Sequence, residues 1–123
     1  PSVRDRCHVR IERDRLTSGR GSCWGVVLFD AAPNFELDIV LLHDVPATGD
    51  SFVSVGFVPN RFRAQELADA DKPWSRGNFV GFGGPLVGRQ EACRRHPSSA
   101  ARGLMSGQVL RLRRSGGLCG VAV

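Results

Sequence analysis

Short apolar segments, each followed by turn-forming residues, recur about every ten residues through the first half of the chain. Segments of this length and spacing are typical of the strands of an all-β sandwich or barrel. The expected strands cover 7–16, 23–30, 35–45 and 51–58. The sequence therefore predicts a mainly β fold with antiparallel strands, in a barrel-like or sandwich-like arrangement with little helix.

The second half predicts one short helix among further extended segments. Residues 63–71 contain good helix formers, and Lys72-Pro73 would end this two-turn helix. The glycine-rich segment 78–88 is expected to be extended. A helical turn is expected before Pro97.

The last segments predict a strand and a paired tail. Residues 107–114 alternate apolar residues with arginines, which predicts a strand at the edge of a sheet with its charged face in solvent. Residues 119–123 are apolar, whereas a free terminus is normally polar and mobile. We therefore expect this tail to be paired or buried.

The length of the chain supports one modest core. Its 123 residues are assigned to a single domain, 1–123, with any internal division expected near 60–78. No run of about 18 apolar residues and no basic and apolar leader occurs, so neither a membrane span nor a signal peptide is expected in the chain. A leader could already have been removed.

The net charge of +5 comes from arginine, because Lys72 is the single lysine. Guanidinium groups bind phosphate and sulfate bidentately, so one hypothesis is a basic module that binds a glycosaminoglycan or a nucleic acid. Its candidate binding residues are Arg111, Arg113 and Arg114. Codon usage in a GC-rich genome would produce the same bias, and the phenylalanines lie apart from the arginines, unlike the stacking residues of nucleic-acid modules.

The four cysteines allow three disulfide pairings if the protein is oxidised. They are Cys7, Cys23, Cys93 and Cys119. No CxxC or other zinc-ligand spacing occurs, although His8 and His96 lie near two of them, so no metal site is predicted. The GFGGPLVG segment lacks the spacing and the following helix of a dinucleotide or phosphate loop, so no cofactor is predicted either.

An acidic residue, Asp38, interrupts the apolar stretch 34–45, where it is expected to be buried. His43 follows five positions later, which in a strand places the two side chains on opposite faces and about 16 Å apart. His43 is therefore not expected to act as a base beside Asp38. A lone buried charge would be costly, so Asp38 needs either a functional partner or a backbone or arginine partner.

Several stretches of the chain can be compared with a known family by their order. They include 8–21 (HVRIERDRLTSGRG), 26–45 (VVLFDAAPNFELDIVLLHDV), 79–84 (FVGFGG) and 114–120 (RSGGLCG). These stretches resemble segments that occur in the same order in trypsin-like serine proteases. The most specific part is ELDIVLL, which resembles the segment of that family that carries the triad aspartate, at Asp38. The resemblance implies part of a trypsin-like double barrel and a secreted or extracellular protein.

The motifs of the catalytic histidine and the nucleophilic serine of that family have no counterpart in the sequence. A triad aspartate orients and supports the histidine and does no chemistry alone. The resemblance therefore implies a catalytically degenerate protease-like domain, or a protease fragment, that acts by binding a protein or an anionic polymer.

A second enzyme hypothesis starts from GSCWG at 21–25, which resembles the nucleophile segment of papain-like cysteine proteases. It would make Cys23 the nucleophile of a small cysteine hydrolase. In that family the histidine follows about 130–150 residues downstream, whereas His43 and His96 follow Cys23 by 20 and 73 positions. The segment after Cys23 is also strand-like, which favours Cys23 as a buried or disulfide-bonded strand residue.

Overall fold

A computed structural model of the chain describes residues 2–18, 24–44, 53–69, 78–82, 93–94 and 105–122. The elements in chain order are β1 (Val3–Cys7), β2 (Val9–Glu12), β3 (Arg15–Ser18), β4 (Val26–Phe29), β5 (Asn34–Val40), β6 (Val53–Phe57), α1 (Ala64–Asp69), β7 (Asn78–Phe82), β8 (Cys93–Arg94), β9 (Val109–Ser115) and β10 (Leu118–Ala122). The prediction of a mainly β chain with little helix is confirmed.

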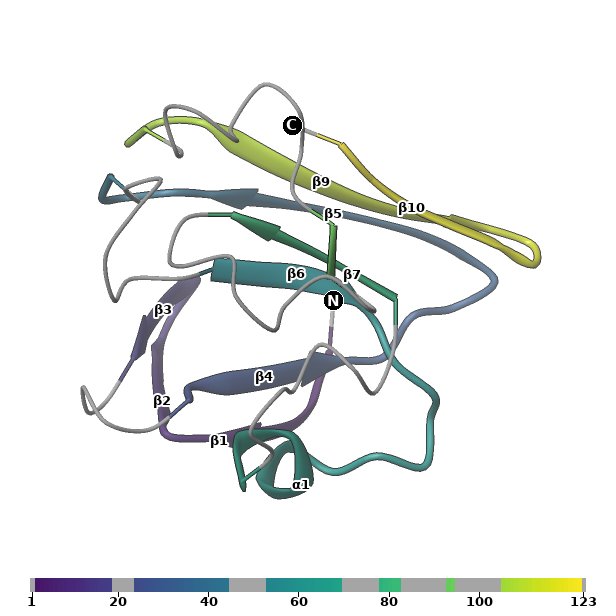
Figure 1. The fold of residues 1–123 in the computed structure, drawn as a ribbon, viewed down its shortest axis with the longest axis horizontal. Helices are drawn as coiled ribbons and strands as arrows, with labels where there is room; N and C mark the ends of the chain where they lie inside the picture. The colour runs from purple at the N-terminus through teal and green to yellow at the C-terminus, as the bar shows by residue number, and fades with distance from the viewer. Residues whose placement is uncertain are drawn as a thin grey trace.

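The described strands form four sheets. Three-stranded sheets have the orders β10-β9-β5 and β6-β7-β8, and two-stranded sheets are formed by β1 with β4 and by β2 with β3. All pairs are antiparallel except β7 with β8. In Figure 1 the β10-β9-β5 sheet lies along one side of the molecule, β6 and β7 lie beneath it, and β1, β4 and α1 lie at the opposite side. Within the described ranges these sheets do not join into a closed barrel.

A first core lies between the β10-β9-β5 sheet and β6. Leu110 is completely buried, and it clusters with Leu41, Val55 and Leu112. Phe35 and Ile39 of β5, Val53 and Phe57 of β6, and Val121 of β10 pack around this cluster. Because alternate residues of a strand point to one face, the buried positions of β5 and β9 leave the residues between them on the outside.

A second core joins β1 and β4 to α1. Ala64 is completely buried and Leu67 is 2% exposed, and both pack with Cys7 and Leu28. The thiol of Cys7 also lies 3.0 Å from Oε1 of Gln65, to which it donates. A helix of six residues is too short to be stable alone, so these contacts with the β1–β4 sheet hold it in place.

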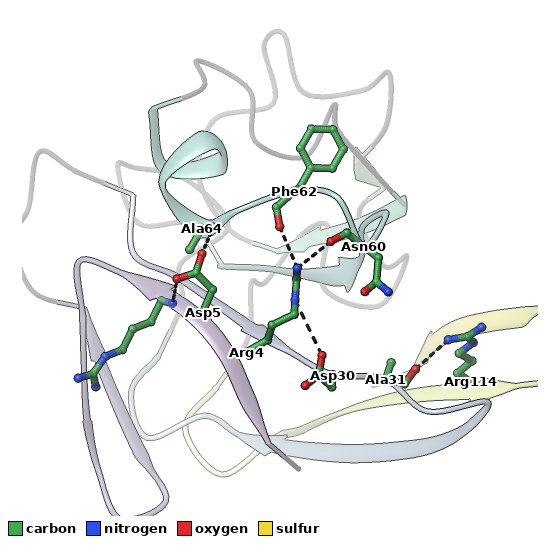
Figure 2. Close-up of polar contacts among 9 residues, drawn as sticks. Arg4, Asp5, Asp30, Ala31, Asn60, Phe62, Ala64 and Arg114 are labelled. Carbon is green, nitrogen blue, oxygen red and sulfur yellow. Dashed lines mark hydrogen bonds and ion pairs between the residues drawn. The ribbon is translucent and has the colours of Figure 1, made fainter.

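Two side chains of β1 fix the start of this helix, as Figure 2 shows. Asp5 accepts the backbone N–H of Ala64 at 2.8 Å, so a side chain of β1 caps the first turn of α1. The guanidinium of Arg4 donates to the carbonyls of Asn60 and Phe62 at 2.7 and 2.9 Å. Hydrogen bonding to Ala64 is the largest of the effects that hold the pKa of the Asp5 carboxyl below its ordinary value.

The amino-terminal strand prediction is wrong in detail. The segment 7–16 was expected to be one strand, but it contains the end of β1, all of β2 and the start of β3. The chain turns at His8 and again at Arg13, whose φ angles of 55° and 56° lie in the left-handed region. Neither position carries the glycine or asparagine that usually marks such a turn.

A glycine allows β4 to begin close to β2 and β3. A Cβ atom at Gly25 would lie 2.9 Å from Cγ2 of Val9 and 3.2 Å from the carbonyl oxygen of His8. No side chain fits there without displacing its neighbours, so Gly25 is required by this packing.

The carboxyl-terminal segments depart from their predictions in two places. The stretch 107–114 was expected at a sheet edge, but β9 is the central strand between β10 and β5. The reason is that the apolar tail folds back as β10 through Gly116-Gly117, which confirms that the tail is paired. The helical turn expected before Pro97 is wrong at Cys93 and Arg94, which pair with β7 as β8.

Candidate functional site

The site is the side of the β10-β9-β5 sheet that faces away from the first core, which we call the outer face. Its residues are Asn34, Glu36, Asp38 and Val40 of β5, Val109, Arg111, Arg113 and Ser115 of β9, and Leu118, Gly120 and Ala122 of β10. Strand alternation defines this set, because the residues between them on β5 and β9 include the core residues Phe35, Ile39, Leu110 and Leu112.

An ionic ladder of four side chains crosses the middle of the outer face. Asp38 lies directly opposite Arg111, and Glu36 lies directly opposite Arg113. Arg111 binds Asp38 bidentately, with Nε and Nη2 at 2.7 and 2.9 Å from the two carboxylate oxygens. Nε of Arg111 also lies 3.5 Å from Glu36, which in turn accepts from Nε of Arg113 at 3.0 Å. The ladder therefore has alternating charges and links β5 to β9.

The hydrogen bond from Arg111 is the main cause that lowers the pKa of the Asp38 carboxyl below its ordinary value of 3.8. The same pair raises the pKa of Arg111 above its ordinary value. Each partner thus stabilises the charged form of the other. Both side chains are 42–47% exposed, so water screens the pair and its contribution to stability is modest.

The outer face is apolar at the end of β5 and the start of β9. Val40 and Val109 lie directly opposite each other, and they are 52% and 39% exposed. Leu42 and Met105 are also exposed at this end. Hydrogen bonds join their two segments: Ser106 Oγ donates to the carbonyl of Leu42, and the N–H of Gly107 to that of Leu41. We call Val40, Leu42, Met105 and Val109 the apolar end.

Small side chains flank the ladder on β10. Gly120 pairs with Arg113, and Ala122 pairs with Arg111. Leu118, near the hairpin turn, is 80% exposed, whereas the exposed free thiol Cys119 is paired with Arg114 and belongs to the other face of the sheet. The small residues leave the guanidinium groups accessible from the β10 side of the sheet.

The arginines proposed for anion binding do not act as one group. Arg111 and Arg113 lie on the outer face in contact with carboxylates. Arg114 lies on the other face of β9, where it donates to the carbonyls of Ala31 and Gly116 at 2.8 and 3.2 Å, the first of which appears in Figure 2. Arg114 therefore anchors the turn before β5.

Asp38 was expected to be a buried carboxylate, and that expectation is wrong. Its side chain is 42% exposed on the outer face. It does have an arginine partner, which was one of the expected alternatives, since Arg111 binds both of its oxygens. The role of Asp38 as a triad acid stays a prediction.

Of the other candidate residues, the structure describes His43 but not Cys23 or His96. His43 lies beyond the end of β5, and the following Asp44 accepts the backbone N–H of Ser106 at 2.7 Å. Cys23 and His96 lie outside the described residues, as does most of the GFGGPLVG segment. In the described part of the chain, no cluster of three or more His, Cys, Asp or Glu side chains could hold a metal ion. Nor does that part contain a helix of the length and apolarity that crossing a membrane requires.

Sequence reasoning missed the apolar end. Alternation in 35–40 and 109–114 shows which residues share a face of each strand. It does not show that these two strands pair, because they are far apart in the chain. The signal available was Val40 continuing the face of Glu36 and Asp38, where an apolar residue replaces the expected polar one.

No family model, curated protein or solved structure matches this chain in comparisons with known proteins. The class of the protein is therefore stated from its structure alone. It is a mainly β chain with an exposed sheet face that is partly charged and partly apolar. The resemblance to trypsin-like proteases stays a prediction.

Replacing Asp38 with asparagine is expected to change how stability depends on pH. The folded-state pKa of Asp38 is depressed, so the pair contributes stability above pH 3.8 that is lost as the pH falls through the folded-state value. The difference in the free energy of unfolding between the parent and Asp38→Asn should therefore shrink as the pH falls below 3.8. Denaturant titrations from pH 7 to about 2 measure this difference. Asp14→Asn in the β2–β3 turn is the matched control. A difference in the free energy of unfolding between the parent and Asp38→Asn that stays the same at every pH would contradict the prediction.

Proposed function

We propose that this chain is a binding domain without protease activity, and that its outer face contacts another protein. The observation that carries the proposal is the apolar end beside the ionic ladder. Single exposed apolar residues are normal on protein surfaces. Here two valines on neighbouring strands form a directly opposed exposed pair, and two further apolar residues lie at the same end. An apolar surface bordered by polar groups is typical of protein interaction sites.

The contacts of Asp38 support a role in binding over one in catalysis. A triad aspartate accepts a hydrogen bond from the histidine that it orients. In this chain both carboxylate oxygens of Asp38 accept from Arg111. A histidine could take that place only if the bidentate pair opened. A degenerate protease-like domain would be one kind of binding domain, and this relationship remains part of the proposal.

The charge of the ladder favours a protein partner over an anionic polymer. Its two arginines are balanced by Glu36 and Asp38, so the ladder has no net charge. A phosphate or sulfate chain would have to displace these carboxylates and would meet their repulsion. A protein surface can instead contact the charges and the apolar end together.

Site-specific crosslinking tests the binding face. A photo-crosslinking residue in place of Val109 should capture a protein partner, whether another copy of the chain or a protein in an extract of its source. The same residue in place of Val3, a valine of β1 that is 42% exposed, is the matched control. Equal capture at both positions would contradict the proposal. Stoichiometric labelling of a serine by a fluorophosphonate probe would contradict the absence of protease activity.

A further inference from the structure

The outer face contains two rows of opposite charge, one on β5 and one on β9, that are in register. The β9 row contains Arg111 and Arg113, and the β5 row contains Asp38 and Glu36 directly opposite them. Both rows end in an exposed valine at the same end of the sheet, Val109 on β9 and Val40 on β5. A surface of this kind is complementary to itself. When the β5 row of one copy lies over the β9 row of a second copy, each charged side chain faces one of opposite charge.

We propose that the protein bound by the outer face is a second copy of this chain, docked face to face about a two-fold axis. The axis runs parallel to the strands, midway between β5 and β9. The inference rests on the proposed function, because it names the partner of the same face. Closed two-fold dimers are the commonest protein oligomers, and they require a self-complementary patch.

This rotation places β5 of one copy over β9 of the other and leaves positions along the strands unchanged. Asp38 of each copy then faces Arg111 of the other, and Glu36 faces Arg113. Val40 faces Val109 in the same way, so the apolar ends meet. An axis perpendicular to the strands within the interface would place the apolar end of one copy over the opposite end of the other, at Asn34 and Ser115.

The arginines of the ladder can bind carboxylates of their own copy and of the second copy at the same time. Arg111 uses Nε and Nη2 to bind Asp38, and Arg113 uses Nε and Nη2 to bind Glu36. A guanidinium has five N–H donors, so Nη1 of each can reach a carboxylate of the second copy. Gly120 and Ala122 on β10 add no bulk beside the arginines. The rows therefore supply orientation, and the apolar ends supply burial of apolar surface.

The dimer is expected to be weak. Stable interfaces use about 20–30 residues a side, and the outer face offers fewer. We expect reversible association with a dissociation constant between about 1 µM and 1 mM. Sedimentation of the parent chain over this concentration range should show a monomer–dimer equilibrium that weakens as salt is raised, because part of the contact is ionic.

A pair of opposite substitutions tests the arrangement of the two copies. Val40→Glu and Val109→Arg should each weaken self-association at least tenfold, because each places a charge against a valine. A one-to-one mixture should restore the dimer, because Glu at 40 of one variant faces Arg at 109 of the other while the remaining Val40 and Val109 still meet. Val3→Glu is the matched control and should associate like the parent. Thermal unfolding of each variant verifies that it is folded.

The outcomes separate this inference from the proposed function. A parent chain that stays monomeric up to about 1 mM, the upper limit expected above, overturns the second-copy proposal, as does a mixture of folded variants that fails to associate. If such a monomer still crosslinks another protein from Val109, the binding face stands and its partner is a different protein. If the chain dimerises but Val3→Glu weakens the dimer as much as Val40→Glu does, the outer face is not the dimer interface and the second-copy proposal fails, while the proposed function is judged by the crosslinking from Val109.

Discussion

Replacing Leu110 with alanine is expected to lower the free energy of unfolding by about 2–5 kcal/mol. Leu110 is completely buried in the central strand of the β10-β9-β5 sheet, where it clusters with Leu41, Val55 and Leu112. Truncation removes apolar contacts and leaves a cavity that a sheet on one side and β6 on the other cannot easily close. Urea denaturation monitored by fluorescence or circular dichroism measures the loss.

Two controls separate the cavity from other effects of the change. Leu110→Met keeps most of the volume and should cost less than about 1.5 kcal/mol. Val109→Ala changes the neighbouring residue on the outer face, which is 39% exposed, and should cost less than Leu110→Ala. A loss of under about 1 kcal/mol for Leu110→Ala would show that the first core does not hold the sheet together.

The sequence was sufficient to predict elements whose pattern is local. The segments 35–45 and 107–114 were predicted as strands, of which the first ends earlier, at Val40, and the helix formers at 63–71 predicted the position of α1. The apolar composition of 119–123 predicted a paired tail, which is β10. In each case the residues that carry the pattern lie within one element, so no knowledge of distant contacts is needed.

The predictions that failed have both local and non-local causes. Asp38 was expected to be buried because Leu37 and Ile39 flank it, although strand alternation, which is a local pattern, points those residues and Asp38 to opposite faces. Its partner Arg111 is distant in the sequence and is brought opposite it by strand pairing. Similarly, the turn at Arg13 has no glycine to mark it, so the β2–β3 hairpin was not recognised.

The pairing of β5 with β9 produces every feature of the candidate site. A shift of the register by one residue would move the charged residues of β5 to the core side and the core residues to solvent. The buried Leu110 and Leu112 therefore fix the register, and the register aligns Asp38 with Arg111 and Val40 with Val109. Folding and the proposed binding thus depend on the same strand pair, so variants of the outer face require a check of stability before a loss of binding is interpreted.

Replacing Leu67 with alanine is the second change with a large expected effect. Leu67 is 2% exposed, and with Ala64 it forms the contact of α1 with Cys7 and Leu28. We expect a loss of about 2–5 kcal/mol in the free energy of unfolding, as for other leucine truncations in a core. Leu67→Met, which keeps the volume, should lose less than about 1.5 kcal/mol.

The effect of Leu67→Ala should be concentrated in the second core. The six-residue helix has little stability of its own and depends on packing, with the Asp5 cap and the Arg4 contacts holding only its start. Hydrogen exchange should therefore show a larger loss of protection in α1, β1 and β4 than in β5, β9 and β10, whose core is the separate cluster around Leu110. Equal loss in both regions would mean that the two cores unfold as one unit, and self-association through the outer face would then weaken in Leu67→Ala as well. Under the expected outcome the same variant keeps its outer face, and its sedimentation behaviour matches that of the parent chain at temperatures where both are folded.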